Sequence, residues 1–566
     1  MAIKVITSET AIPIDVNFKV SAGPGAGKTH WLINHIKSVL KDSEKLILGR
    51  KIACITYTNI GVDTIKSRLP FAFDKVYIGT IHNFFYENVV KHYLIFIAKE
   101  EGLNIDKLKV IDDELLVSYN LIKEIGKETK QTYIDPGCFN VAVRNCRWHL
   151  KNNSLEFAPD RPYSATSKFR ATLKPENYAI YKKKIWSRGI MTYDDIIYFT
   201  YKLIDRFPFI LDILRASYPY FFIDEFQDST PLQVEILKRI SQENTVVGIV
   251  GDKAQSIYGF AGADPSLLDN FFIGQPSENY KIEGNRRSTE EIVDLLNAIR
   301  KDLQQFSANH TNAQRPVLYI GNRIKAFEIA KGSLDEGEEL QFLSYRNDTA
   351  NSMRERYEDK IDNENLLNSI QDGDVRRVNT IVACIKAIEL ARLGIFKESF
   401  RQMSKMDLPP DESVSVIKHF LLDYESFKNQ TVSNFIAYIN VNFAKLKVAG
   451  LGKGKPKVFY NDHTYLQLAM EVGTFEKHVL YETIHKAKGD EFDNVFVGID
   501  KIEKGKGKGK ELDFLLYPNL LNDEEQRVYY VAISRAKKRL FIQFPELSDN
   551  KIKDLKKLPL DVIVIK

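Results

Sequence analysis

The alternation of apolar and polar positions predicts strands and helices in turn along the first part of the chain. Residues 16–20 (VNFKV) alternate like a half-buried strand, and the apolar positions of residues 30–40 recur at helical spacing. Further strands are predicted at 51–59 and 76–85, with a helix at 60–69 between them. Because strands alternate with helices, we expect a parallel sheet whose strands are joined by helical crossovers.

Further along, this pattern stops and returns twice, which predicts an α/β fold of two units that each carry a mainly helical insertion. The apolar runs at 220–223 and 245–250 are typical of buried parallel strands, whereas 86–184 shows charged helical faces. The six expected segments are 1–85 and 185–278 for the first unit, 86–184 for its insertion, 279–348 and 460–566 for the second unit, and 349–459 for a reduced second insertion.

Length and composition are those of a globular protein with several domains. The 566 residues are too many for a single core, and a hydrophobic fraction of 44% with a charged fraction of 27% is ordinary. A net charge of +5 provides no overall basic field, so any contact with nucleic acid must come from local patches.

Cysteine usage and hydropathy favour a cytoplasmic location. No two cysteines have the C-x-x-C spacing, so we expect reduced and mostly buried thiols. No stretch approaches about 18 uninterrupted apolar residues, and the first residues lack a signal-peptide pattern. We therefore expect neither secretion nor a membrane partner. The four cysteines are Cys54, Cys138, Cys146 and Cys384.

A glycine-rich stretch, AGPGAGKT, stands between the predicted strand at 16–20 and the predicted helix at 30–40. Such a loop points backbone N–H groups at an anion, and the helix N-terminus adds partial positive charge. Lys28 can then reach the β- and γ-phosphates, and Thr29 can hold Mg²⁺. The residues expected at the nucleotide are Ala22, Gly23, Gly25, Ala26, Gly27, Lys28, Thr29 and His30, with Ala22 at a position where glycine is usual.

Acidic and basic side chains elsewhere complete a candidate ATP-hydrolysing site. Asp224 and Glu225 follow a buried strand, where one carboxylate can hold Mg²⁺ and the next can deprotonate the attacking water. Gln255 follows the next buried strand and can sense the γ-phosphate. Arg287 and Arg535 of the second unit are candidate arginine fingers, since guanidinium groups suit a developing phosphate charge.

The order of these motifs resembles that of superfamily 1 helicases of the UvrD/Rep/PcrA type, over most of the chain apart from the insertions. A P-loop kinase would explain only the first block, and a pure DNA-binding module would not need Glu225 or Arg535. The eight blocks that carry the resemblance are AGPGAGKT, TYTNIGVDTIKSRL, GTIHNFF, FIDEFQDST, VGDKAQSIYGFAGA, IEGNRRST, TIHKAKGDEFDNVFV and EEQRVYYVAISRAKK.

The resemblance implies two RecA-like P-loop domains, 1A and 2A, with helical insertions 1B and 2B and ATP and Mg²⁺ in the cleft between them. It also implies that single-stranded DNA crosses both domains, that movement runs 3′ to 5′, that Gln255, Arg287 and Arg535 contact the γ-phosphate, and that Glu491 meets the ribose. An aromatic side chain such as Phe260 can stack on any base. The implied DNA contacts are Thr58, Asn59, His82, Asn83, Tyr258, Phe260, Thr483 and His485.

Several positions depart from the family pattern. No glutamine precedes Lys28, although the family usually reads adenine with one, so adenine selectivity must rest on another group. Arg286 stands where a tyrosine commonly stacks on adenine, and a guanidinium can also stack on a base. Residues 258–263 read YGFAGA where YGWRGA is common, and the second insertion is short, so coupling and unwinding are expected to differ.

The function predicted from the sequence is ATP-dependent DNA helicase or translocase activity, 3′ to 5′ on single-stranded DNA, with tailed duplex DNA as a further partner. The alternative is a DNA-sensing ATPase subunit of a nuclease-containing anti-phage complex, similar to Gabija, with weak or no unwinding. A stable nuclease partner would favour that alternative.

Overall fold

The fold is given by a computed structural model. The described residues are 3–47, 49–70, 74–111, 119–131, 134, 139, 142–143, 146–151, 154–159, 177–271, 276–309, 313–355, 366, 370, 372, 374–404, 406, 408–452, 454–472, 479–502 and 508–565.

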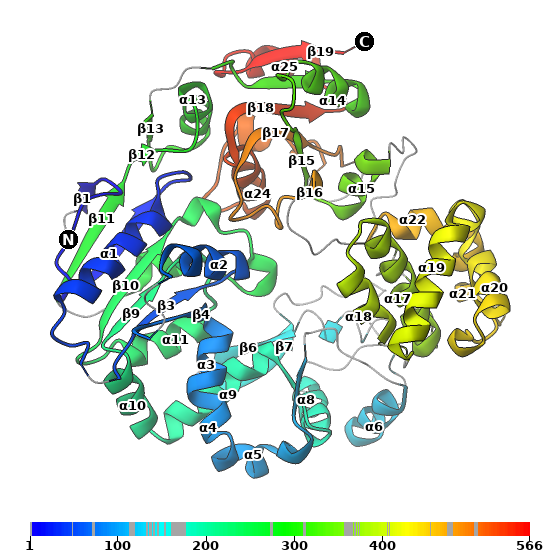
Figure 1. The fold of residues 1–566 in the computed structure, drawn as a ribbon, viewed down its shortest axis with the longest axis horizontal. Helices are drawn as coiled ribbons and strands as arrows, with labels where there is room; N and C mark the ends of the chain where they lie inside the picture. The colour runs from blue at the N-terminus through cyan, green and yellow to red at the C-terminus, as the bar shows by residue number, and fades with distance from the viewer. Residues whose placement is uncertain are drawn as a thin grey trace.

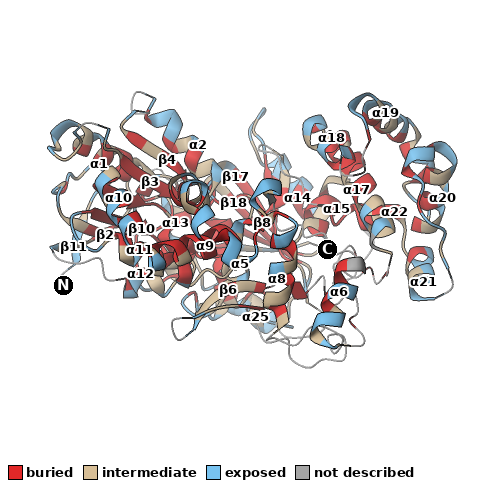
Figure 2. Ribbon diagram, turned by 90° about the horizontal axis from the view of Figure 1, so that it is seen from below, coloured by how far each residue is buried: buried red, intermediate tan, exposed pale blue. Residues whose placement is uncertain are grey.

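Two parallel sheets form the centres of two α/β units, which lie at the left and at the top of Figure 1. The first sheet has the order β1 (Ile3–Ile6), β11 (Ser277–Ile282), β2 (Asn17–Ala22), β10 (Val246–Gly251), β9 (Tyr220–Ile223), β3 (Ile52–Thr56) and β4 (Val76–Thr80). All its strand pairings are parallel. Strands β3, β9 and β10 are buried at every position, as continuous apolar runs between two helical layers require (Figure 2).

The second sheet is also parallel throughout the described residues. Its order is β16 (Tyr481–Thr483), β15 (Gln341–Ser344), β17 (Phe492–Gly498), β18 (Ala536–Phe544), β14 (Val317–Ile320) and β19 (Asp561–Val564). Its covering helices include α13 (Glu290–Ile299), α14 (Arg323–Gly332), α15 (Asn347–Glu355) and α24 (Glu524–Ile533). The two parallel sheets confirm the predicted α/β fold class.

The first insertion is less uniformly helical than its sequence predicts. It contains helix α8 (Tyr178–Ser187), but also an antiparallel hairpin of β6 (Cys146–Lys151) and β7 (Ser154–Pro159). In addition, β5 (Lys109–Ile111) pairs in parallel with β8 (Ile190–Thr192). The described part of the insertion thus combines helices with short strands that its sequence pattern did not indicate.

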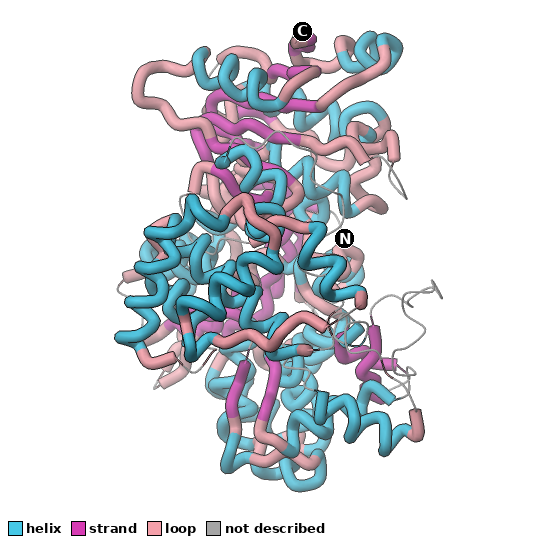
Figure 3. The backbone as a smooth tube through the Cα atoms, turned by 90° about the vertical axis from the view of Figure 1, so that its right-hand side faces the viewer, coloured by secondary structure: helices cyan, strands magenta, loops and turns pink. Residues whose placement is uncertain are grey.

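The second insertion forms a separate group of helices with its own apolar core, and this group faces the viewer in Figure 3. The core includes Tyr460, Tyr465 and Val472, so this group extends past the predicted end at residue 459. Its helices are α17 (Val375–Arg392), α18 (Phe396–Ser404), α19 (Pro410–Phe427), α20 (Val432–Asn442), α21 (Lys455–Asp462) and α22 (Tyr465–Ala469).

Two further sequence predictions need correction. The strand predicted over 76–85 ends at Thr80, because the Thr80 hydroxyl accepts a hydrogen bond from the Asn83 N–H (3.3 Å) and begins helix α3 (Ile81–Phe85). The boundary predicted at 278/279 falls inside β11, which pairs with β2 in the first sheet. The first unit therefore continues to Ile282.

The remaining general predictions concern thiols and membranes. Cys54, Cys146 and Cys384 are buried and form no disulfide in the described part of the chain, whereas Cys138 lies outside it. None of the helices in the described ranges is long and apolar enough to cross a membrane.

Candidate functional site

The glycine-rich loop, residues 22–27, turns sharply from β2 into α1 (Lys28–Asp42). Gly25 and Gly27 have φ angles of 68° and 79°, which side chains rarely adopt and glycine adopts readily. The Lys28 ammonium is buried and donates to the Ala22 carbonyl at 3.3 Å, across the concave side of the loop. The loop therefore presents the N-terminus of α1 and one ammonium group to the same space, as an anion-binding site requires.

The acidic pair lies directly beside this loop, at the carboxyl end of β9. The Thr29 hydroxyl donates to Asp224 Oδ2 at 2.8 Å. Burial, together with the neighbouring Glu225 carboxylate, raises the pKa of Asp224 above its usual value. Burial also opposes ionisation of Glu225, but Lys28 and Lys488 outweigh it and hold the Glu225 pKa below its usual value. Glu225 is thus held as a carboxylate that can accept a proton.

The backbone of Glu225 is strained. Its φ of 55° places a glutamate in the left-handed region, where strain of about 1–3 kcal/mol per residue is typical of functional sites. Gln227 fixes the side chain by donating to Glu225 Oε2 at 2.5 Å and accepting from the Asp252 N–H at 2.8 Å. This arrangement ties the orientation of Glu225 to the segment that follows β10.

The second unit closes directly onto the loop. The Arg286 N–H donates to the Gly25 carbonyl at 2.8 Å, and the Asn285 amide donates to the Pro24 carbonyl at 3.0 Å. A Cβ added at Gly25 would lie 2.5 Å from Asn285 Oδ1, so no larger residue fits there without movement. The two units therefore meet at the loop itself.

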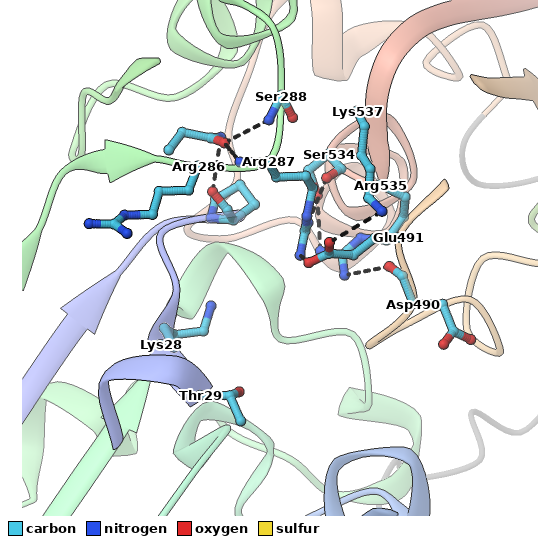
Figure 4. Close-up of polar contacts among 12 residues, drawn as sticks. Lys28, Thr29, Arg286, Arg287, Ser288, Asp490, Glu491, Ser534, Arg535 and Lys537 are labelled. Atoms are coloured by element: carbon cyan, nitrogen blue, oxygen red, sulfur yellow. Dashed lines mark hydrogen bonds and ion pairs between the residues drawn. The ribbon is translucent and has the colours of Figure 1, made fainter. Parts of the chain in front are cut away.

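Two guanidinium groups of the second unit, the buried Arg535 and the largely buried Arg287, lie together across from Lys28 and Thr29 (Figure 4). Arg287 donates to Glu491 Oε1 at 2.6 Å and to the Ser534 carbonyl at 2.7 Å. Arg535 donates to Gln255 Oε1 at 3.0 Å. Burial, with the neighbouring charge of Arg287, lowers the pKa of Arg535 to about 9. These two guanidinium groups, of which Arg287 is already paired with Glu491, form a positively charged site that suits a phosphate.

Polar atoms around the loop lack partners, which also indicates a polar ligand. The Ser8 hydroxyl, Gln305 Oε1 and Arg287 Nε are buried and have no hydrogen-bond partner among the described residues. Buried polar atoms usually have hydrogen-bond partners. These three atoms therefore indicate a position at which a bound ligand or a water molecule would supply them.

The predicted Mg²⁺ ligands fit a divalent cation. Thr29 and Asp224 present two oxygen atoms in direct contact, and Mg²⁺ typically takes one or two protein oxygens with the rest from phosphate and water. Within the described ranges, no group of three or more His, Cys, Asp or Glu side chains could hold a metal alone. The site therefore suits a metal that arrives with a phosphate ligand.

A row of rings joins Tyr258 and Phe260 of the first unit to His485 and Tyr345 of the second. The Phe260 ring, 58% exposed, lies 5.4 Å from the His485 ring, and the Tyr345 ring also lies 5.6 Å from His485. Tyr258 joins the row at 6.0 Å from Phe260 and donates to the His485 carbonyl at 3.3 Å. The exposed rings of Phe260 and Tyr345 offer faces on which bases can stack.

The other predicted DNA-contacting residues lie at the ends of strands. Thr58 caps α2 (Asn59–Arg68) by accepting from the Gly61 N–H at 3.0 Å, and Asn59 is exposed beside it. His82 packs 6.0 Å from the ring of Tyr193, and burial lowers its pKa to about 4. Asn83 is exposed, whereas Thr483 is buried at the end of β16.

Comparison with known proteins agrees with this geometry. A family model of the UvrD/REP helicase N-terminal domain matches residues 6–272, and a model of the UvrD-like helicase C-terminal domain matches residues 460–546. Together these matches cover more than half of the chain. The chain belongs to the UvrD/Rep helicase family.

Similar proteins of this family include bacterial helicases named PcrA. The ATP-dependent DNA helicase PcrA of Bacillus subtilis (strain 168) is 27% identical over 309 residues, which is 52% of this chain and 39% of that protein. The PcrA proteins of Leuconostoc citreum and Staphylococcus aureus (strain COL) are each 26% identical, over 52% and 50% of this chain and 38% of each relative. The aligned region spans less than half the length of these curated relatives.

In this UvrD-like chain, the structure adds residues that the sequence analysis did not select. Lys488 forms a buried ion pair with Asp228 and donates to the Gln255 carbonyl at 2.9 Å, so it joins the two units. Arg300 of the second unit donates to Asp252 Oδ2 at 2.9 Å. Each of these two residues pairs with a residue more than 40 positions away in the sequence. Lys488 lies within one of the eight blocks that carry the family resemblance, whereas Arg300 lies outside them. The other additions are Glu9, Gln227, Gln305 and Tyr345.

Proposed function

We propose that the chain is an ATP-dependent DNA helicase or translocase that moves 3′ to 5′ on single-stranded DNA. One observation carries this proposal. Glu225 lies beside the glycine-rich loop of the first unit, and Arg287 and Arg535 of the second unit lie opposite it. Hydrolysis at such a site depends on both units at once, so it can drive their relative movement.

Each residue has a role in the proposed hydrolysis. Glu225 takes a proton from the water that attacks the γ-phosphorus, and the bond to the bridging oxygen of ADP breaks. Lys28, Arg287 and Arg535 offset the charge that develops on the γ-phosphate oxygens. Thr29 and Asp224 would hold Mg²⁺, which neutralises phosphate charge when bound.

Two other assignments remain part of the proposal. Gln255 would couple the presence of the γ-phosphate to the proposed DNA path. Its side-chain oxygen accepts a hydrogen bond from Arg535, and it lies three residues before Tyr258 of the aromatic row. Glu491 would meet the ribose only after leaving Arg287, with which it pairs at 2.6 Å.

The proposed DNA path follows the row of Phe260, His485 and Tyr345, with Tyr258 next to Phe260. Because this row takes rings from both units, opening and closing of the nucleotide cleft would change the spacing of its stacking positions. The remaining DNA contacts proposed are Thr58, Asn59, His82, Asn83 and Thr483.

The proposed domains follow the two sheets. Residues 1–85 and 185–282 would form domain 1A, and the second sheet would form domain 2A, with insertions 1B and 2B.

Directional movement is the experiment that tests this proposal. Streptavidin bound to biotin at the 5′ end of a single strand should be displaced in the presence of ATP, because a 3′-to-5′ motor runs toward that end. A 3′ biotin should retain its streptavidin, and Glu225→Gln should displace neither. Displacement from the 3′ end alone would reverse the proposed polarity. ATP hydrolysis without displacement from either end would instead support a DNA-sensing subunit, for which a nuclease partner could be sought by co-purification.

A further inference from the structure

Arg300 joins the two units through a buried ion pair. It lies at the C-terminal end of α13 in the second unit, and Asp252 follows β10 in the first. Arg300 Nη1 donates to Asp252 Oδ2 at 2.9 Å, and Arg300 Nη2 lies 2.8 Å from Asp252 Oδ1. The Arg300 side chain is 4% exposed, and the Asp252 side chain is fully buried. Two parallel contacts of this kind fix both the position and the orientation of the carboxylate.

The same carboxylate also holds Gln255. Gln255 Nε2 donates to Asp252 Oδ2 at 2.6 Å, while Arg535 Nη2 donates to Gln255 Oε1 at 3.0 Å. A carboxylate only accepts hydrogen bonds, and a guanidinium only donates them. The Gln255 amide therefore satisfies both neighbours in one orientation, with its NH₂ group on Asp252 and its oxygen on Arg535.

This orientation depends on the charge of Asp252. Burial opposes ionisation of Asp252, but Arg300 outweighs it, with a contribution from Lys28, and holds the pKa of Asp252 below its usual value. A protonated carboxyl group can donate as well as accept, so it would no longer fix the direction of the amide. Arg300 thus keeps Asp252 in the form that orients Gln255.

We propose that Arg300 is a positioning residue for hydrolysis, which acts through Asp252 to keep the oxygen of Gln255 directed at Arg535. This inference rests on the proposed function, which assigns Arg535 to the γ-phosphate. Because the ion pair crosses from one unit to the other, the orientation of Gln255 depends on contact between the two units.

Loss of Arg300 has a specific consequence for the amide. Without the arginine, Asp252 becomes a buried carboxylate with no guanidinium partner, which favours its protonation. A reversed amide would place the Gln255 NH₂ group against the Arg535 guanidinium, where two donors face each other. Since a hydrogen bond to a charged group is worth at least about tenfold in an equilibrium, Arg300→Met should lower kcat at least about tenfold.

A double variant, Arg300→Met with Asp252→Asn, separates positioning from stability. It leaves no unpaired buried charge, so it should unfold at a higher temperature than Arg300→Met, and it serves as the test if the single variant does not fold. The Ala254 N–H, which donates to Asp252 Oδ1 at 3.1 Å, would hold the oxygen of the new amide. Its NH₂ group would then face Gln255 and reverse that side chain, so kcat should stay at least about tenfold below wild type.

The experiment measures three quantities for the wild-type chain and both variants: thermal unfolding, equilibrium binding of a fluorescent non-hydrolysable ATP analogue, and ATP turnover with single-stranded DNA. In the double variant, analogue affinity and KM should change less than about threefold while kcat falls, as expected when only the reacting geometry is lost. Arg377→Met is the matched control, because Arg377 holds Asp372 through two 2.6 Å hydrogen bonds inside the second insertion. It should leave kcat unchanged.

Recovery of kcat together with thermal stability in the double variant would overturn the inference, because a purely structural role would explain both. A loss of kcat in Arg377→Met equal to that in Arg300→Met would also overturn it. If the wild-type chain hydrolyses ATP and both Arg300 variants match its kcat, the inference fails and the proposed function stands. A wild-type chain without ATP hydrolysis would contradict both.

Discussion

Gly23 provides a direct test of whether the two units close onto the glycine-rich loop during catalysis. A Cβ at this position would lie 2.5 Å from Gln305 Cδ, a residue of the second unit. The Gln305 side chain is held against the loop by its donation to the Pro24 carbonyl at 3.1 Å, and its N–H donates to Asn297 Oδ1 at 2.9 Å. Gly23→Ala should therefore displace this flexible side chain from the loop.

The size of the effect follows from the distances. Ordinary van der Waals contact begins at 3.4 Å, so relief of the 2.5 Å contact at Gly23 requires the end of the Gln305 side chain to move by nearly 1 Å. This movement gives up its hydrogen bond to the Pro24 carbonyl, worth about 1 kcal/mol, so Gly23→Ala should cost about fivefold. Gln305→Ala removes the same hydrogen bond and should cost about as much.

The assay is DNA-stimulated ATP turnover by wild type, Gly23→Ala, Gln305→Ala and the double variant. Gly23→Ala and Gln305→Ala should each lose about fivefold in kcat, and the double variant should lose no more than either one, because both changes remove the same hydrogen bond. Wild-type turnover in Gly23→Ala would refute the closed contact. A double variant that loses the product of the two single effects, about 25-fold, would place the damage of Gly23→Ala within the loop instead.

Four further outcomes are expected. Lys28→Ala should abolish ATP turnover, and retained turnover would contradict the role of the loop. Glu225→Gln should bind ATP normally but turn it over at least about a hundredfold more slowly, in line with the loss of a general base; an unchanged rate would remove Glu225 from that role. Phe260→Ala should weaken single-stranded DNA binding about five- to 150-fold, equivalent to about 1–3 kcal/mol per base, with little effect on basal hydrolysis; an equal loss of both would indicate core packing. Burial lowers the pKa of His35 to about 4, so the unfolded chain binds more protons and stability should fall by about 3 kcal/mol as pH drops from 6.5 to 4; in thermal unfolding, His35→Leu should flatten this dependence, and an unchanged slope would contradict it.

Short-range sequence signals predicted the strands and the loop well. The apolar runs before Asp224 and Gln255 became β9 and β10, because buried parallel strands need apolar side chains on both faces. The apolar run at 81–85 was less informative, since periodicity in a short apolar run does not distinguish a strand from a buried helix. There the Thr80 cap decided the outcome.

Contacts between distant segments were harder to predict. Strand β11 has a mixed pattern, and its place in the first sheet depends on pairing with β1 and β2, more than 250 residues earlier. Glu9 is similar, because its ion pair forms only when folding brings Arg286 to it. No local pattern in the sequence carries such long-range pairings.

ATP hydrolysis by the purified chain, measured without nucleic acid, with single-stranded DNA and with RNA of equal length, tests the central claim most directly. Since the DNA path and the γ-phosphate site share Gln255 and the segment that follows it, single-stranded DNA should raise kcat at least about tenfold, and RNA should have little effect. Equal rates under all three conditions would contradict the account of a DNA-driven motor.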